Sequence, residues 1–270
     1  MRLPPCWLVR KELKTKATAL VSGCTNMYTM FGLSEELKQQ TRELNPIEAL
    51  TFLADSFPGK IVFSTSFGWE DQVITHMIFE NNLPIKVFTL ETGRLFPETY
   101  YVWNRTMEIY GQPIHAYYPR QDLLEQMVTQ KGPNSFYESV DNRKECCNIR
   151  KVEPLKRALA GNDIWVTGIR AEQSPNRQHM DNIEWDESNN LVKFHPIIDW
   201  HLDQVKDYIK LYNIPYNTLH DRGFPSIGCA PCTRAVQPGE DFRAGRWWWE
   251  DQSKKECGLH ETHGVKLEVS

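Results

Sequence analysis

Residues 60–71 read KIVFSTSFGWED, and this stretch decides the predicted fold. Its first half is a run of β-branched and aromatic side chains, which favours a strand of a buried sheet. The strand leads through a hydroxyl-rich turn into a helical pattern at residues 70–80. Such a turn can hold an anion, because the N–H groups and the dipole of the helix point at it. It lacks the G-K-[ST] of a Walker A loop, and a plain helix cap explains it equally well when it is taken alone.

Two more strands are predicted by similar runs at residues 86–90 (KVFTL) and 164–167 (IWVT). Helical patterns at residues 97–110, 122–129 and 152–160 lie between them. Strands that alternate with helices predict an α/β protein with a parallel sheet flanked by helices. Ligands of such sheets bind beyond the carboxyl ends of the strands, so the turns after the strands are the first places to look for a site.

The chain divides into three predicted segments. Residues 1–33 are basic and lack a clear amphipathic period, and we predict a disordered extension there, with a cleaved targeting segment as the alternative. Residues 34–222 form the predicted nucleotide-binding α/β domain, which starts with two helices joined near Asn45-Pro46. Residues 223–270 are rich in glycine, proline and cysteine, and they predict an irregular tail that docks on the same domain.

Composition excludes several classes of protein. The 31 basic and 35 acidic residues give a net charge of -4, so no broad basic surface for nucleic acid or an anionic membrane is expected. The run of three tryptophans at residues 247–249 could stack on bases, but packing against the sheet explains it better. No apolar run approaches the roughly 20 residues of a membrane span, and no secretory signal is visible. We therefore predict a cytoplasmic protein without a nucleic-acid or membrane partner.

Four of the seven cysteines have the spacing of metal ligands. Cys229 and Cys232 form a C-x-x-C pair, and Cys146 and Cys147 are the natural source of two further thiolates. Four thiolates suit either a structural zinc ion or an iron-sulfur cluster. Adjacent cysteines on a helix point about 100° apart, which favours a larger cube with separate iron corners over one compact zinc ion. The alternatives are a redox disulfide at the C-x-x-C and a chance buried pair at the other two positions.

Cys257 is the best candidate for a nucleophile. It lies in the sequence KKECGLH at residues 254–260, where two lysines and His260 supply positive charge that favours the thiolate. The alternative is a free surface thiol without a role.

Polar and basic residues follow all three predicted strands. Bidentate arginine contacts suit phosphate and sulfate, so arginines that gather on these loops predict a dianionic substrate. Solvated surface charge is the usual explanation for any single one of them. The candidate residues are Ser64, Thr65, Ser66 and Gly68 in the first turn, Leu90, Thr92 and Gly93 in the second, Arg170 and Arg177 in the third, and Arg243 and Arg246 before Cys257.

Seven stretches in order resemble the motif series of assimilatory adenylylsulfate reductases, the cluster-bearing members of the phosphoadenylylsulfate reductase family. They are SFGWED, LETGRLFPETY, KECCNIRKVEPLKRAL, GIRAEQSPNR, IGCAPCTR, RAGRWWWE and KKECGLH, and they span about residues 60–260. The resemblance implies an adenine nucleotide alpha hydrolase-like fold. It also implies reduction of adenylylsulfate to sulfite and AMP in sulfate assimilation and cysteine biosynthesis, with thioredoxin or a glutaredoxin-like dithiol protein as electron donor.

The same resemblance assigns roles to single residues. It implies that Cys257 is the nucleophile, which forms a cysteine S-sulfonate, and that the first turn approaches phosphate and ribose while the second lines the adenine. Arg170 and Arg177 match the arginine loop of the family. One 4Fe-4S cluster per chain is implied on Cys146, Cys147, Cys229 and Cys232, and basic residues around the sulfate are implied at Lys151, Arg243, Arg246 and His260.

Several alternatives stay open. Phe67-Gly68-Trp69 departs from the S-G-A form common among cluster-bearing members, so the same reaction on phosphoadenylylsulfate is the main alternative. A zinc-stabilised binding module is a second one. Sulfur transfer to tRNA is disfavoured, because its S-G-G-x-D-S loop is absent. Both a monomer and a homo-oligomer fit the sequence.

Overall fold

A computed structural model describes residues 27–173, 177 and 179–250, and these residues form two compact units. Within the described chain, unit 1 comprises residues 27–88, 105–115 and 161–216, and unit 2 comprises residues 89–104, 116–160 and 217–250. The predicted boundary after residue 222 is therefore not a boundary of these units. The described part of the predicted tail belongs to the same unit as two earlier segments of the chain, and it packs against residues of those segments.

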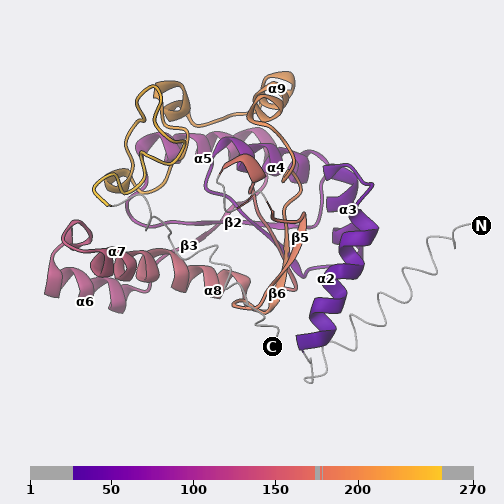
Figure 1. Cartoon of the computed structure of the whole chain (residues 1–270), viewed down its shortest axis with the longest axis horizontal. Helices are drawn as coiled ribbons and strands as arrows, with labels where there is room; N and C mark the ends of the chain where they lie inside the picture. Colours follow the sequence, from indigo (N-terminus) through magenta and orange to yellow (C-terminus); the bar gives the residue numbers. More distant parts are fainter. Residues whose placement is uncertain (1–26, 174–176, 178, 251–270) are drawn as a thin grey trace, which may run out of the picture. The chain divides into compact units, whose positions relative to one another are not determined.

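The sheet has six strands in the order β3-β2-β1-β4-β6-β5 (Figure 1). The strands are β1 Ile61–Ser64, β2 Lys86–Leu90, β3 His115–Tyr117, β4 Ile164–Val166, β5 Ile183–Asp186 and β6 Leu191–Phe194. β1 lies between β2 and β4 and is parallel to both, and β4 is parallel to β6. The three strands predicted from the sequence are thus confirmed, as is the α/β class.

One pair of strands differs from the predicted parallel sheet, because β5 and β6 are antiparallel. Only residues 187–190 connect them, and Asn190 adopts a left-handed φ of 52° in this turn. A parallel crossover needs a dozen or more residues. A connection as short as this one can only make a hairpin.

The helices are, in chain order, α2 Met27–Thr41, α3 Pro46–Ser56, α4 Trp69–Glu80, α5 Pro97–Tyr110, α6 Gln121–Lys131, α7 Val140–Cys147, α8 Glu153–Leu159 and α9 Leu202–Tyr212. The predicted junction of two helices is confirmed: Asn45 caps α3 through a capping box with Glu48, and Pro46 opens the helix. α2 begins inside the predicted extension, so residues 27–33 are helical and that boundary was wrong. Leu33 and Leu37 explain this, because both bury their side chains. Residues 1–26 lie outside the described chain.

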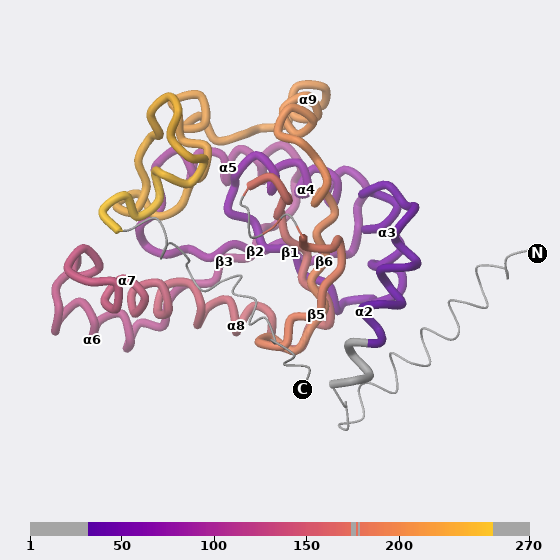
Figure 2. Tube along the Cα trace, viewed as in Figure 1, coloured from indigo at the N-terminus to yellow at the C-terminus, as the bar shows by residue number. Residues whose placement is uncertain are grey.

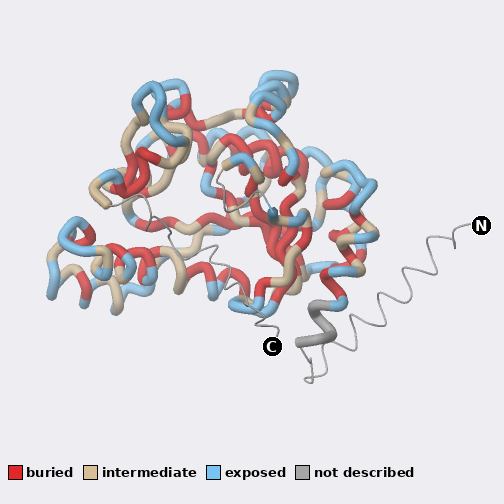
Figure 3. The backbone as a smooth tube through the Cα atoms, in the orientation of Figure 1, coloured by how far each residue is buried: buried red, intermediate tan, exposed pale blue. Residues whose placement is uncertain are grey.

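The core of unit 1 lies along the central strands, where buried residues are concentrated (Figure 3). Phe63 on β1, Trp165 on β4 and Val192 on β6 are almost fully buried. α4 is buried from Trp69 to Phe79 and packs against α3 and α9. A helix that is enclosed on all sides belongs to the core, so the turn that starts it is firmly held.

Unit 2 contains one continuous helical segment in three parts. α7 is followed by a π-helical turn, η2 Asn148–Val152, and then by α8. π turns are rare and occur mostly at functional sites. The described chain ends at Glu250, next to α7, and Figure 2 shows this end in yellow. Among the described helices, none is both long enough and apolar enough to cross a membrane.

Candidate thiolate site and anion-binding turns

The four predicted metal ligands line one hollow in unit 2. Cys146, Cys147, Cys229 and Cys232 are all buried and border a space of about 340 Å³, a volume that includes solvent at its mouth. The other lining residues are Arg94, Phe136, Arg143, Arg150, Lys151 and Trp247. The structure therefore brings together thiols that are more than 80 positions apart in the sequence.

The two cysteine pairs are held by different local structures. Cys146 and Cys147 form the last turn of α7, whose first turn is capped by the side chain of Ser139. In the C-x-x-C pair, Cys229 precedes a 3₁₀ turn, η6 Ala230–Cys232, and Cys232 is its last residue. The Ala230 N–H donates to the carbonyl oxygen of Arg94 at 2.8 Å, and the Tyr137 hydroxyl donates to the Pro231 carbonyl at 2.7 Å. These bonds fix the C-x-x-C turn on both sides.

Burial and nearby cations act in opposite directions on the thiols. Burial opposes the ionisation of Cys229, but Lys151, the Thr92 hydroxyl, Arg246 and Arg150 outweigh it and lower the pKa of this thiol. Burial and the neighbouring Cys229 raise the pKa of Cys232 to about 12. A thiol of this kind ionises readily only when a metal binds it.

This donor set fits a four-thiolate metal group. All four sulfurs border the same hollow, and positively charged side chains around it compensate for the charge of thiolates. Among the described residues, no three His, Cys, Asp or Glu side chains are grouped as ligands of a single metal ion. The identity of a bound group stays a prediction.

Three arginines of the hollow were not predicted from the sequence: Arg94, Arg143 and Arg150. Arg143 and Arg150 are buried, although guanidinium groups are rarely buried without partners. Arg150 donates from Nη1 to the Thr92 carbonyl oxygen at 2.5 Å. A signal was present, since Arg143 and Arg150 are three or four residues from a cysteine on one helical segment and therefore lie on its face.

The second predicted turn borders the same hollow. Thr92 Oγ1 and Cys229 Sγ are joined by a hydrogen bond of 3.4 Å. Gly93 has a φ of 71°, which favours glycine, and a Cβ at this position would be 3.3 Å from Nη1 of Arg150. Leu90 is half-buried at the end of β2. The role of Leu90, Thr92 and Gly93 in nucleotide binding stays a prediction.

The first predicted turn, in unit 1, uses several of its own donors internally. Asp71 accepts from both the backbone N–H and the hydroxyl of Ser66, at 2.6 and 2.7 Å. Thr65 donates its N–H to Phe88 and accepts the N–H of Phe67 on its hydroxyl. Gly68 is the N-cap of α4 and provides no side-chain cap. An anion bound here would therefore meet the start of α4 rather than the N–H of Ser66.

Ser64 and Asp71 complete this turn in different ways. Ser64 Oγ accepts a hydrogen bond of 2.8 Å from the indole N–H of Trp165. Burial raises the pKa of Asp71 to about 6, against the lowering effect of its bonds from Ser66. A carboxyl group that takes up a proton near neutral pH repels an anion less than an ordinary aspartate does.

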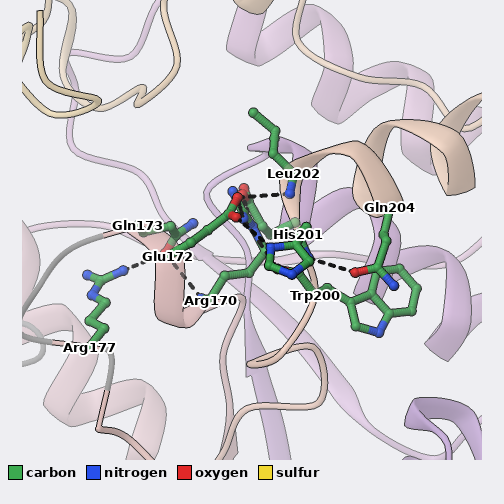
Figure 4. A network of polar contacts seen from close by, with 9 residues as sticks. Arg170, Glu172, Gln173, Arg177, Trp200, His201, Leu202 and Gln204 are labelled. Atoms are coloured by element: carbon green, nitrogen blue, oxygen red, sulfur yellow. Dashed lines mark hydrogen bonds and ion pairs between the residues drawn. The ribbon is translucent and has the colours of Figure 1, made fainter.

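The third predicted loop contains a buried ion-pair network in unit 1 (Figure 4). The Arg170 guanidinium is 1% exposed and donates from Nε to Glu70 at 2.8 Å, and it also pairs with Glu172. Glu172 in turn accepts from His201 Nδ1 at 3.0 Å and from the N–H of Leu202 at 2.8 Å. Arg170 is thus enclosed by carboxylates and ties the loop to the first turns of α4 and α9.

The other predicted basic residues have mixed positions. Arg177 is half-buried and donates from Nη1 to Gln173 at 2.5 Å. Lys151 lines the thiol hollow from the π turn, and Arg246 is buried with its guanidinium against Gly228, where a Cβ would lie 2.3 Å from Nη2. Arg243 is half-buried, and its N–H bonds to Asp241. Cys257 and His260 lie outside the described residues.

The sheet, with polar turns after its strands, defines an α/β protein with an adenine nucleotide alpha hydrolase-like fold. A crystal structure of phosphoadenylyl-sulfate reductase from Candida auris, in complex with phosphate, matches it with a TM-score of 0.66 and 29% identity, over 80% of this chain and 100% of that one. The family described as the phosphoadenosine phosphosulfate reductase domain matches residues 60–235. The chain belongs to this family.

Curated relatives are similar over most of their length. The adenosine 5'-phosphosulfate reductase of Allochromatium vinosum is 50% identical over 220 residues, which cover 82% of this chain and 86% of that protein. The protein of the same name from Burkholderia cepacia is 47% identical over 234 residues, or 87% of this chain and 92% of that protein.

Proposed function

We propose that this protein reduces adenylylsulfate (adenosine 5'-phosphosulfate) to sulfite and AMP in sulfate assimilation and cysteine biosynthesis. The observation that carries the proposal is the cation-lined hollow of four cysteines, in a chain about half identical to relatives named for reduction of this nucleotide. It is an oxidoreductase that acts on a sulfur group.

Cys257 performs the first chemical step. Its thiolate attacks the sulfur of adenylylsulfate, the bond from sulfur to the bridging oxygen breaks, and AMP leaves with the electron pair. The product on the enzyme is a cysteine S-sulfonate. A thiolate of a dithiol protein such as thioredoxin or glutaredoxin then attacks Sγ of Cys257, and sulfite leaves with the electron pair of the broken S–S bond. The second thiol of the partner resolves the mixed disulfide, so the dithiol supplies both electrons.

Basic residues stabilise the charge of the transferring group. Lys151, Arg243, Arg246 and His260 are the residues we assign to the sulfate, and Arg177 is our candidate for the nucleotide phosphate. Preorganised cations lower the barrier of such a step without moving electrons themselves. Arg170 has a different task, since its guanidinium is already enclosed by Glu70 and Glu172: it positions the loop that carries Arg177.

Cys146, Cys147, Cys229 and Cys232 are the residues that would hold one 4Fe-4S cluster. The cluster would supply a rigid charged core that orders the α7 end and the C-x-x-C turn beside Lys151. Chemical analysis of anaerobically purified protein tests this assignment. We expect iron and acid-labile sulfide in equal amounts, near four of each per chain, whereas zinc without sulfide in a colourless protein would contradict it and favour a zinc-stabilised module.

The same reaction on phosphoadenylylsulfate is the second candidate, and the Candida auris structure favours it as a specific observation. That substrate carries a further phosphate, which requires an additional cationic pocket. Comparison of kcat/KM on the two nucleotides decides between them. We expect a preference for adenylylsulfate, and a higher kcat/KM on phosphoadenylylsulfate would overturn the substrate assignment.

Label transfer tests the covalent step. Wild-type protein incubated with ³⁵S-labelled adenylylsulfate without reductant should retain about one label per chain, on Cys257. Cys257→Ser should retain none and should keep its iron, because this residue is not one of the assigned ligands. Labelling of the Cys257→Ser protein to the wild-type level would exclude Cys257 as the nucleophile.

The chemistry also sets the compartment that we propose. A free thiolate nucleophile and a dithiol electron donor both need a reducing environment, which the cytoplasm maintains.

A further inference from the structure

Glu250, the last described residue, is tied to the helix that carries Cys146 and Cys147. Arg143 Nε donates to Glu250 Oε1 and Arg143 Nη2 donates to Oε2, both at 2.9 Å. The two residues are 107 positions apart, and their side chains are only 1% and 4% exposed. Two parallel bonds between a guanidinium and a carboxylate fix the orientation of both groups as well as their distance.

The same guanidinium is bound to the cysteine site. Arg143 precedes Cys147 by four residues on α7, so the two side chains share a face of the helix. Arg143 is also linked to Cys147 by a side-chain hydrogen bond and by charge. One buried arginine therefore contacts both a predicted cluster ligand and the end of the described chain.

Trp247 completes the attachment. Two guanidinium groups lie over its indole ring, with the Cζ atoms of Arg143 and Arg246 at 4.8 and 4.9 Å from the ring centroid. The backbone N–H of Trp247 donates to the carbonyl of Cys232 at 3.1 Å, and the backbone carbonyl of Trp247 accepts the N–H of Glu250 at 2.9 Å. Trp247 has a φ of 42°, a backbone state that non-glycine residues keep only when their surroundings impose it. Residues 247–250 thus form a turn that is held at both ends.

Cys257 follows Glu250 by seven residues. A chain of this length reaches at most about 24 Å, so the position of Glu250 limits where the thiol can act. We propose that the Arg143–Glu250 pair is a clamp: it fixes the position and orientation of the chain at Glu250, seven residues before Cys257, and it does so from the cysteine site itself. Arg143 and Glu250 are positioning residues in this proposal, which rests on the proposed role of Cys257.

The expected effect has two parts, and only one of them is specific to a clamp. Even if the chain were released as far back as the Trp247 bond to Cys232, it would gain only three residues of slack. Slack alone lowers the effective concentration of the thiol only about 1.7-fold, from the -3/2 power of length. A loss of orientation costs more, because attack on sulfur needs aligned partners. A decrease well above two-fold therefore indicates directional control.

The experiment compares single-turnover S-sulfonation of Cys257 by ³⁵S-labelled adenylylsulfate in wild type, Glu250→Gln and Glu250→Asp. Asp keeps the charge but is one methylene too short for both bonds. We expect the saturating rate to decrease about five-fold or more in Gln and less in Asp, with an unchanged concentration for half-saturation. The alkylation rate of Cys257 by iodoacetamide should stay at the wild-type value, because the small reagent needs no positioning.

Glu240→Gln is the matched control. Glu240 makes the same kind of bidentate pair with Arg234, at 2.7 and 2.8 Å, but this pair is about one-third exposed and spans only six positions. We expect wild-type rates from this variant. Iron content is measured in every protein, so that loss of the metal site is separated from loss of positioning.

Three outcomes are distinguishable. If wild type itself takes up no label, the proposed function fails. If wild type is labelled and both Glu250 variants are sulfonated within about two-fold of it, the clamp is overturned. If Glu250→Gln loses iron, Glu250→Asp decides: an iron-replete Asp variant with a wild-type rate also overturns the clamp, and a reduced rate with normal alkylation supports it.

Discussion

A Cβ atom on Gly168 would lie 2.2 Å from Oδ1 of Asp71, so the backbone after β4 and the first turn of α4 are in direct contact in unit 1. No side chain fits between them. We expect Gly168→Ala to lower the free energy of unfolding by about 1–3 kcal/mol, the usual cost of overpacking, as measured by urea denaturation.

Gly32→Ala provides the control, because a Cβ there meets nothing within 4 Å and the residue lies in α2. Its expected effect is a gain of about 0.5–1 kcal/mol. If Gly168→Ala costs as much in an Asp71→Ala background as in wild type, the contact with Asp71 is not the cause.

Asp71 should make stability depend on pH. Burial raises its pKa from 3.8 to about 6, so the folded state binds a proton that the unfolded state has released between these values. The resulting stabilisation is fully present below pH 3.8 and is lost as the pH rises through 6; over the whole window it amounts to about 3 kcal/mol. Urea denaturation from pH 5 to 7.5 measures the upper part. Asp71→Asn should remove it, and an equal pH dependence in wild type and variant would contradict the assignment.

The buried and exposed contacts of the Arg170 network should contribute unequally to the free energy of unfolding. Glu70→Gln leaves a buried guanidinium with one carboxylate fewer, which should cost about 3 kcal/mol. His201→Ala removes only an exposed partner of Glu172, and this should cost less than about 1 kcal/mol. The unfolding free energies of the two variants test this difference. Similar losses from both would show that the buried pair contributes no more to stability than the exposed one.

Thr92 should stabilise the proposed metal site through Cys229. Thr92→Val removes the hydroxyl that hydrogen-bonds to the sulfur but keeps the shape of the side chain. Loss of such a supporting contact typically weakens metal binding about 10–100-fold, which we expect to observe as faster release of iron to a chelator. Thr92→Ser should restore slow release, because it keeps the hydroxyl. Equal release from the Val and Ser variants would exclude the hydrogen bond as the reason.

The sequence predicted well those elements whose bounds depend on neighbouring residues in the chain. The strand at residues 86–90 and the helix at residues 97–110 have the predicted bounds, because side-chain pattern and flanking proline specify them. β3, β5, β6, α7 and α9 were missed. β6 is buried on both faces and includes Lys193, which pairs with Asp186 across the hairpin and lies over the ring of Trp165. No local pattern reveals such a partner.

The thiol site was partly predictable for the same reason. Spacing identified the four cysteines, but it did not reveal that Arg143 forms an ion pair with Glu250, 107 positions away. The π turn after Cys147 was also not predicted. It depends on the backbone carbonyl of Asn148, which accepts from the N–H of Glu153 instead of from the N–H one residue earlier. Arg170 was assigned to the substrate by sequence, whereas the structure encloses it between carboxylates that no pattern connects to it.

The order of segments in unit 2 matters while the protein is being made. Translation must continue from Cys147 to Cys232 before the second pair of thiols exists, which takes on the order of 4–17 s at about 5–20 residues per second. During this interval Cys146 and Cys147 are on a nascent chain without their partners. Insertion of the proposed metal group would therefore wait until late in synthesis, and the early pair would have to be kept reduced until then.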